Sequence, residues 1–70
     1  MSHSIIYNLA KRIAKNEILS GIQTPKDYRI DNDRRSIELL HFKLGREPSK
    51  EEIISLEKEV IAWISEFLKS

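Results

Sequence analysis

The last third of the chain constrains the fold most strongly. From Ser49 to Leu68 no glycine or proline interrupts a pattern in which apolar residues recur every three or four positions. At about 100° per residue this spacing gathers them into a stripe over nearly half of a helix surface. Ser49 and Glu52 form an S-x-x-E capping box at its start. The sequence therefore predicts one long amphipathic helix. Its apolar stripe comprises Ile53, Ile54, Leu56, Val60, Ile61, Trp63, Ile64, Phe67 and Leu68.

Two shorter apolar patterns precede this segment. Between residues 4 and 20 the apolar side chains gather on one side of a helix, with polar and basic residues opposite. Gly21 follows, where a left-handed residue would end that helix. A second run spans residues 37–44 and is closed by Gly45 in the same way. Both patterns predict helices, because neither shows the strict alternation of a strand.

The stretch between these two patterns carries two sets of helix-start signals. Thr24 and Pro25 supply a hydroxyl cap and a proline for the first helical position. Residues 31–33 are Asp-Asn-Asp and can cap the helix that follows. Either a short helical turn near residues 25–30 precedes the middle helix, or a single helix begins near Pro25. We favour the short turn, because three consecutive Asx residues compete with a helix interior for backbone hydrogen bonds.

The length of 70 residues leaves room for one hydrophobic core. We therefore expect a single small domain over residues 1–70. Three helices with short connections predict an all-α fold, either a three-helix bundle or an open helical array, with an extra helical turn near 25–30.

Composition excludes several classes of function. The chain has no cysteine, so disulfides, thiolate metal sites and cysteine nucleophiles are ruled out. Its two glycines cannot form a phosphate-binding loop, and no nucleophile motif is present. His3 and His41 lie far apart, and neither has a carboxylate or a second histidine four residues later, so no metal site is expected. We therefore expect no enzyme, no cofactor and no small-molecule substrate.

Nothing in the sequence predicts a membrane or secreted protein. The longest strictly apolar run, residues 60–64, is far shorter than the roughly 20 residues that span a bilayer. Residues 1–4 lack the basic start of a secretory signal. We expect a cytoplasmic protein.

Charge is divided unevenly along the chain. Residues 1–46 carry nine Lys and Arg against five Asp and Glu, whereas residues 47–70 carry three lysines against six glutamates. Such a division can mark a nucleic-acid surface, or a solvated surface whose two halves attract each other after folding. We favour the second interpretation, because dedicated nucleic-acid modules have a higher overall basicity than this net charge of +1.

Two ionisable side chains fall on apolar faces. Glu57 lies within the stripe of the last helix, where a lone carboxylate would be costly to bury. Either it lies at the edge of the stripe and extends its carboxylate to solvent, or pairs with Arg12, His41 or Lys43, or it sets the register of a helix–helix interface. His41 falls near the apolar face of the middle helix, so we expect it to be partly buried and bonded to a backbone group.

The middle helix is apolar on two sides. Ile37, Leu40 and Leu44 form one edge, while Leu39 and Phe42 point the other way. Such a helix is either sandwiched between its neighbours or exposes a patch, and an exposed Leu39/Phe42 pair would be a recognition surface. Tyr7, Tyr28 or Trp63 would lie alongside that surface.

From these features we predict a small helical protein-interaction module, a bacterial or phage regulatory or inhibitor protein. It would bind another protein or a second copy of itself. A homodimer is expected, because a domain this small, without a disulfide or metal, has marginal stability of its own. The predicted partner-binding residues are Leu39, Phe42, Trp63 and Phe67, with Arg34 and Arg35 at the rim.

The alternative is a small nucleic-acid-binding domain, such as a DNA-binding regulator. Basic side chains on the first helix and at the start of the middle helix could contact phosphates. The last helix is too apolar and too acidic to enter a groove, so a helix-turn-helix of ordinary form is not expected. The nucleic-acid-binding residues would be Lys11, Arg12, Lys15, Arg34 and Arg35.

Residues 44–53 read LGREPSKEEI, which resembles the L-G-R-E-P-(T/S)-x-E-E-(I/L) turn of primary bacterial sigma factors. In that family the turn opens a helix of the domain after the promoter-melting region. A second L-G turn ends that helix soon afterwards, whereas here residues 55–68 continue without a break. The resemblance covers ten residues of capping chemistry, and no role in transcription is predicted from it.

Overall fold

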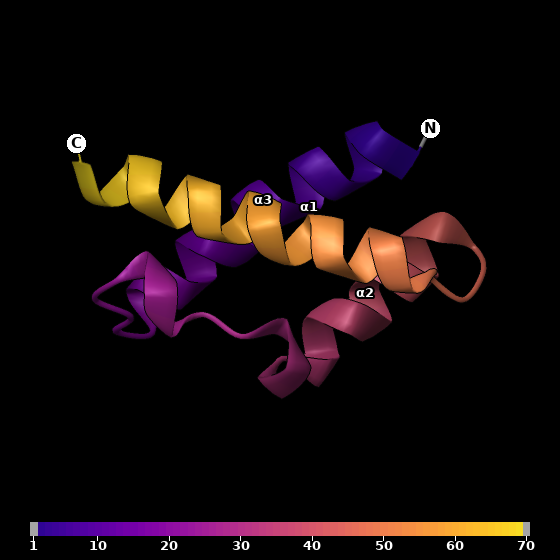
Figure 1. The fold of residues 1–70 in the computed structure, drawn as a ribbon, viewed down its shortest axis with the longest axis horizontal. Helices are drawn as coiled ribbons and strands as arrows, with labels where there is room; N and C mark the ends of the chain where they lie inside the picture. Colours follow the sequence, from indigo (N-terminus) through magenta and orange to yellow (C-terminus); the bar gives the residue numbers. More distant parts are fainter. Residues whose placement is uncertain (1, 70) are drawn as a thin grey trace.

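The structure is a computed structural model that describes residues 2–69, with only the backbone of Ser2. Within this part of the chain it contains helices and no strand, which confirms the predicted all-α fold. Figure 1 shows α1 and α3 running side by side in the same direction, while α2 returns below them. The helices are α1 (Ser2–Leu19), α2 (Arg34–Leu44) and α3 (Lys50–Lys69), and two short 3-10 turns, η1 (Pro25–Asp27) and η2 (Ile30–Asn32), connect the first two.

Local capping chemistry sets the element boundaries between α1 and α2. The Thr24 hydroxyl accepts a hydrogen bond from the backbone N–H of Lys26 at 3.1 Å and starts η1. Asp33 caps α2 by accepting a hydrogen bond from the backbone N–H of Ser36 at 3.3 Å. Gly45 ends α2 in the left-handed conformation with φ of 74°, which glycine adopts without a steric clash because it has no Cβ atom. The short turns before α2 confirm the first of the two alternatives for this stretch.

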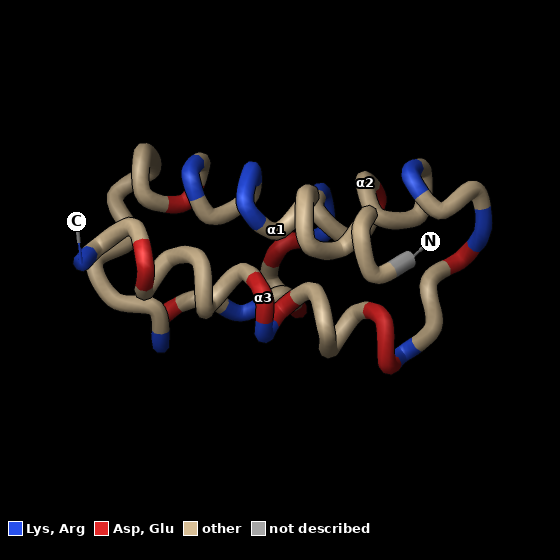
Figure 2. The backbone as a smooth tube through the Cα atoms, turned by 90° about the horizontal axis from the view of Figure 1, so that it is seen from above, with Lys and Arg blue, Asp and Glu red and all other residues tan. Residues whose placement is uncertain are grey.

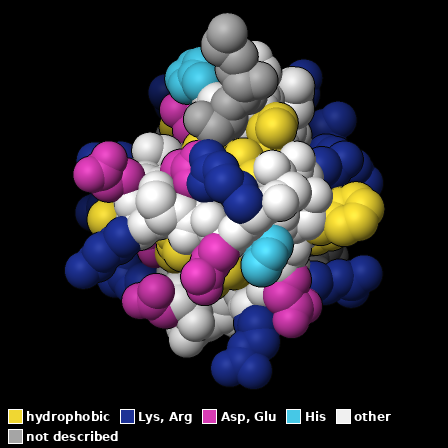
Figure 3. Space-filling view, turned by 90° about the vertical axis from the view of Figure 1, so that its right-hand side faces the viewer, with side chains coloured by type: hydrophobic (Ala, Val, Ile, Leu, Met, Phe, Trp, Pro, Cys, Tyr) yellow, Lys and Arg dark blue, Asp and Glu magenta, His cyan; other side chains and the backbone are white. Residues whose placement is uncertain are grey.

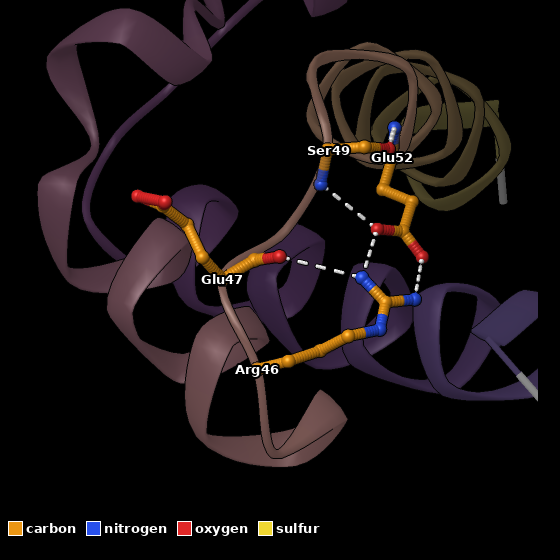
Figure 4. A network of polar contacts seen from close by, with 4 residues as sticks. All are labelled: Arg46, Glu47, Ser49 and Glu52. Carbon is orange, nitrogen blue, oxygen red and sulfur yellow. Dashed lines mark hydrogen bonds and ion pairs between the residues drawn. The ribbon is translucent and has the colours of Figure 1, made fainter.

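The start of α3 is held by the predicted capping box (Figure 4). The backbone N–H of Ser49 donates to Oε1 of Glu52 at 2.9 Å, and the backbone N–H of Glu52 donates to the Ser49 hydroxyl at 3.2 Å. Arg46 donates from both terminal nitrogens to the same carboxylate, at 2.8 and 2.7 Å. The Arg46 hydrogen bonds, and next the one from the Ser49 backbone, lower the pKa of Glu52 to about 2.

The hydrophobic core lies between α1 and α3 and is closed from below by α2 and the two short turns. Tyr28, between the short turns, is 2% exposed, which contradicts the suggestion that it adjoins a recognition surface. Its hydroxyl donates to Oδ2 of Asp33 at 2.7 Å, so the ring is buried while its polar end is satisfied. Burial, followed by the contact with Asp33, raises the pKa of Tyr28. The buried apolar residues are Ile6, Leu9, Ala10, Ile13, Ala14, Tyr28, Ile30, Leu40, Leu56, Val60 and Ile64.

The structure gives Glu57 a partner that was not predicted, and it corrects the prediction for His41. Glu57 is half-buried, and its carboxylate accepts a hydrogen bond from the backbone N–H of Ile30 at 3.0 Å, not from any of the predicted side chains. It therefore holds η2 against α3 within one copy of the chain. His41 is exposed, because α2 turns Leu40 and not its neighbour toward the core.

No helix in residues 2–69 combines the length and the apolar character that crossing a membrane requires.

Candidate interaction surface

Three aromatic rings meet on the outer side of the seam between α1 and α3. Trp63 contacts Tyr7 of α1 edge-to-face, with ring centroids 5.4 Å apart and an interplanar angle of 69°. On its other side it stacks with Phe67, one turn further along α3, at 5.4 Å and 28°. Tyr7 is 45% exposed, and both α3 rings are half-buried. We refer to Tyr7, Trp63 and Phe67 as the aromatic strip.

Two lysines of α1 lie over this strip. Lys11 and Lys15 follow Tyr7 at intervals of four residues, so all three project from one side of the helix. The Lys11 ammonium lies 5.0 Å from the centre of the Trp63 ring, and the Lys15 ammonium lies 6.0 Å from that of Phe67. Within residues 2–69 neither lysine forms an ion pair. Each ammonium is therefore held by a ring face and is available to a carboxylate or phosphate.

The strip ends in an open apolar hollow near the ends of α1 and α3. Lys15, Ile18, Leu19 and Phe67 line this hollow of about 310 Å³. Leu19 is 85% exposed, the largest exposed fraction among the exposed large apolar side chains. It lies on the last turn of α1, pointing away from the core, where no neighbouring element covers it.

A second hollow, of about 550 Å³, separates α1 from the start of α2. Arg12 and Leu19 line it from α1, and Arg35 and Leu39 line it from α2. Glu17 and Asp33 line it as well; burial, and then repulsion from Asp33, raises the pKa of Glu17. Because Leu19 borders both hollows, it joins the aromatic strip on one side of α1 to Leu39 on the other.

The outer surface of α1 is basic and carries no exposed acid. Glu17 is the only acidic residue between Ser2 and Leu19, and it is half-buried. Seen from above, Lys and Arg mark α1, while Asp and Glu recur along α3 (Figure 2). We call this surface and its two flanks the α1 face. It comprises Tyr7, Lys11, Arg12, Lys15 and Leu19 of α1, Trp63 and Phe67 of α3, and Arg35 and Leu39 of α2.

The predicted partner-binding residues do not form one cluster, and Phe42 lies outside the α1 face. Trp63 and Phe67 belong to the aromatic strip, whereas Leu39 and Phe42 lie on α2 and are 39% and 80% exposed. The middle helix is therefore not sandwiched. The end of the molecule in Figure 3 shows an apolar group protruding among Lys and Arg side chains.

The predicted basic residues separate in a similar way. Lys11, Arg12 and Lys15 share the outer surface of α1, and Arg35 lies across the second hollow from Arg12. Arg34 is exposed but does not line that hollow, because neighbouring helix residues point about 100° apart. The prediction that Leu19 belongs, less cleanly than its neighbours, to the apolar side of the first helix is wrong, because this side chain is 85% exposed. At about 100° per residue it falls roughly 120° from Ile13, and this offset is the signal that could have identified it.

Comparisons with protein families, with curated proteins and with solved structures found no match to this chain.

Proposed function

We propose that the chain is a small helical protein-interaction module, a regulatory or inhibitor protein of the cytoplasm that acts through the α1 face. It binds a partner protein or a second copy of itself, without a cofactor and without catalysis. The observation that carries this proposal is the position of Leu19. This side chain is 85% exposed and borders both the hollow at Phe67 and the hollow that Leu39 lines, so it lies between the aromatic strip and α2.

Burial of this surface would supply the binding free energy. Removing apolar area from water contributes roughly 25 cal/mol per Å², and aromatic side chains in the centre of an interface carry a large share of affinity. Trp63 is already positioned by Tyr7 and Phe67, so little conformational freedom is lost when a partner covers it. The lysines around it add charge complementarity for an acidic partner.

Nucleic-acid binding is the second candidate, and one observation favours it. Lys11, Arg12 and Lys15 are all exposed on α1, and Arg35 faces Arg12 across a hollow. Phosphates bind such arrays and release counterions. Against it, Glu17 and Asp33 lie in that hollow and would repel a phosphate backbone.

Site-specific photo-crosslinking in the native cells tests the first candidate. A photoreactive phenylalanine analogue at Leu19 should yield a discrete protein adduct, either of twice the chain mass or with another protein. The matched control places it at Lys58, which is exposed on α3 outside the α1 face. Adducts that are absent from Leu19, or equally abundant from Lys58, would refute a docking role for this face.

The second candidate is tested by salt dependence. If it is correct, a fluorescent DNA or RNA duplex binds at low salt and is released steeply toward physiological salt. A Lys11→Gln, Lys15→Gln variant would then bind more weakly and with a shallower salt slope. No binding even at low salt eliminates this candidate.

A further inference from the structure

The aromatic strip is bordered by opposite charges on its two sides. Lys11 and Lys15 project from α1 along one side. At about 100° per residue, Glu59 and Glu66 of α3 fall roughly 40° and 60° from Trp63, on the side away from buried Val60. Glu59 is half-buried and Glu66 is exposed, with Lys69 of the same helix 3.9 Å from the Glu66 carboxylate. The order across the face is thus lysine, aromatic ring, glutamate.

We propose that this face binds a second copy of the chain, with a two-fold axis running along the aromatic strip. Such an axis exchanges the two sides of the strip, so the lysines of each copy meet the glutamates of the other. A two-fold axis across the strip would instead place lysine against lysine and glutamate against glutamate. Charge complementarity therefore selects the arrangement in which the α3 helices of the two copies run parallel.

The positions of the charged groups along the axis of the strip, here called their levels, agree with this pairing. Lys15 lies over Phe67, and Glu66 precedes Phe67 in the sequence, so both stand near one level of α3. A rotation about an axis along the strip preserves that level, and Lys15 of one copy therefore faces Glu66 of the other. Lys11, over Trp63, stands between the levels of Glu59 and Glu66.

Dimer formation would also cover the aromatic strip, which is partly exposed in the single copy. The face is narrow, on a molecule of 33 × 22 × 17 Å, so we expect a dimer with a dissociation constant of roughly micromolar order. This inference rests on the proposed function and names one partner for it.

Charge reversal tests the pairing. The first variant carries Lys11→Glu and Lys15→Glu, and the second carries Glu59→Lys and Glu66→Lys. Each variant then has two sides of one sign and should dimerise at least tenfold more weakly in sedimentation equilibrium, with helical content unchanged by circular dichroism. When the two are mixed, every contact again joins opposite charges, and a mixed dimer should form with near wild-type affinity. Because Glu59 is half-buried, Glu59→Lys can unfold the chain. In that case two single variants, Lys15→Glu and Glu66→Lys, take the place of the two double variants.

Matched controls separate this pairing from general attraction between oppositely charged proteins. Lys26→Glu with Lys43→Glu, and Glu38→Lys with Glu47→Lys, reproduce the same net charges at exposed positions outside the strip. Each control should keep the wild-type dimer, and mixing the two should not strengthen it.

A wild-type chain that stays monomeric at millimolar concentration would overturn the dimer. So would folded charge variants that fail to combine, or controls that weaken the dimer equally. A monomer that still forms adducts with another protein from Leu19 would overturn this inference alone and leave the proposed function standing.

Discussion

The carboxylate of Glu57 accepts a hydrogen bond from the backbone N–H of Ile30, 27 residues earlier in the chain, at 3.0 Å. Ile30 is 3% exposed, so this backbone N–H lies where water is scarce and a partner is required. One side chain of α3 thereby fixes the turn η2, which leads into the cap of α2. Glu57, the polar residue in the apolar stripe of α3, therefore makes a tertiary contact within one chain.

Removing this acceptor should destabilise the fold. Glu57→Ala leaves the Ile30 N–H without a partner, and we expect the free energy of unfolding to fall by about 1–3 kcal/mol. Glu57→Gln keeps an acceptor oxygen and should cost less than half as much. Urea denaturation measures both. Equal losses for the two variants would show that the hydrogen bond contributes nothing.

The contact between Arg46 and Glu52 predicts a dependence of stability on pH. The pKa of Glu52 is lowered to about 2 in the folded chain, against 4.5 for the free side chain, chiefly by hydrogen bonds from Arg46. The ionised form is therefore stabilised by folding. This contribution is complete above pH 4.5 and is lost as the pH falls toward 2. Glu52→Gln should thus lower stability at pH 7, and its difference from wild type should shrink as the pH falls through this range.

Denaturation at a series of pH values measures this difference in stability. A second pair of variants, Arg46→Gln with and without Glu52→Gln, shows how much of the difference depends on Arg46. In the Arg46→Gln background Glu52→Gln should have a smaller effect and a weaker dependence on pH. A difference that stays constant from pH 7 to pH 2 would contradict the assignment.

The ionised Glu17 carboxylate should destabilise the folded chain, whereas that of Glu52 stabilises it. Its pKa is raised from 4.5 by burial and by the nearby Asp33, so the folded state favours the protonated form. That contribution to stability is present below pH 4.5 and is lost as the pH rises through the raised pKa of the folded state. Glu17→Gln should therefore stabilise the chain at pH 7 and have little effect below pH 4.5. Thermal unfolding at both pH values tests this, with Glu38→Gln as an exposed control; a destabilised Glu17→Gln variant at pH 7 would be inconsistent with it.

Adjacent leucines of α2 should differ sharply in their effect on stability. Leu40 has no exposed surface, so Leu40→Ala creates a cavity in the core and should cost about 2–5 kcal/mol. Leu39 is 39% exposed, and Leu39→Ala should cost about 1 kcal/mol or less. Chemical denaturation of both variants tests which side of α2 packs. Similar costs would mean that α2 is covered on both sides.

Cross-linking can test the direction of the two copies in the proposed dimer. His3 and Leu19 lie near opposite ends of α1, about 24 Å apart at 1.5 Å per residue. With the two-fold axis along the strip, like ends of α1 lie at the same level. A flexible bismaleimide should therefore link two copies of His3→Cys, or two copies of Leu19→Cys, in a chain that has no other cysteine. Preferential links between the two different variants would exclude this axis.

Part of the candidate surface could be predicted from the sequence, because exposure follows from helical position. Leu39 and Phe42 lie opposite the buried edge of their helix, and both are exposed. Lys11 and Lys15 lie opposite the apolar side of the first helix in the same way. Their position over Trp63 and Phe67 could not be predicted, because it depends on which side of α1 packs against α3.

The sequence by itself determined the helices and their ends. Thr24, Asp33, Gly45 and the pair Ser49–Glu52 act on backbone groups within a few residues, so their roles can be inferred from spacing alone. Tertiary structure decided which groups meet across helices. The partner of Glu57, the burial of Tyr28 and the linking position of Leu19 depend on how each helix is rotated about its axis. That rotation is set by the packing of the apolar sides of all the helices against one another, and the capping residues do not specify it.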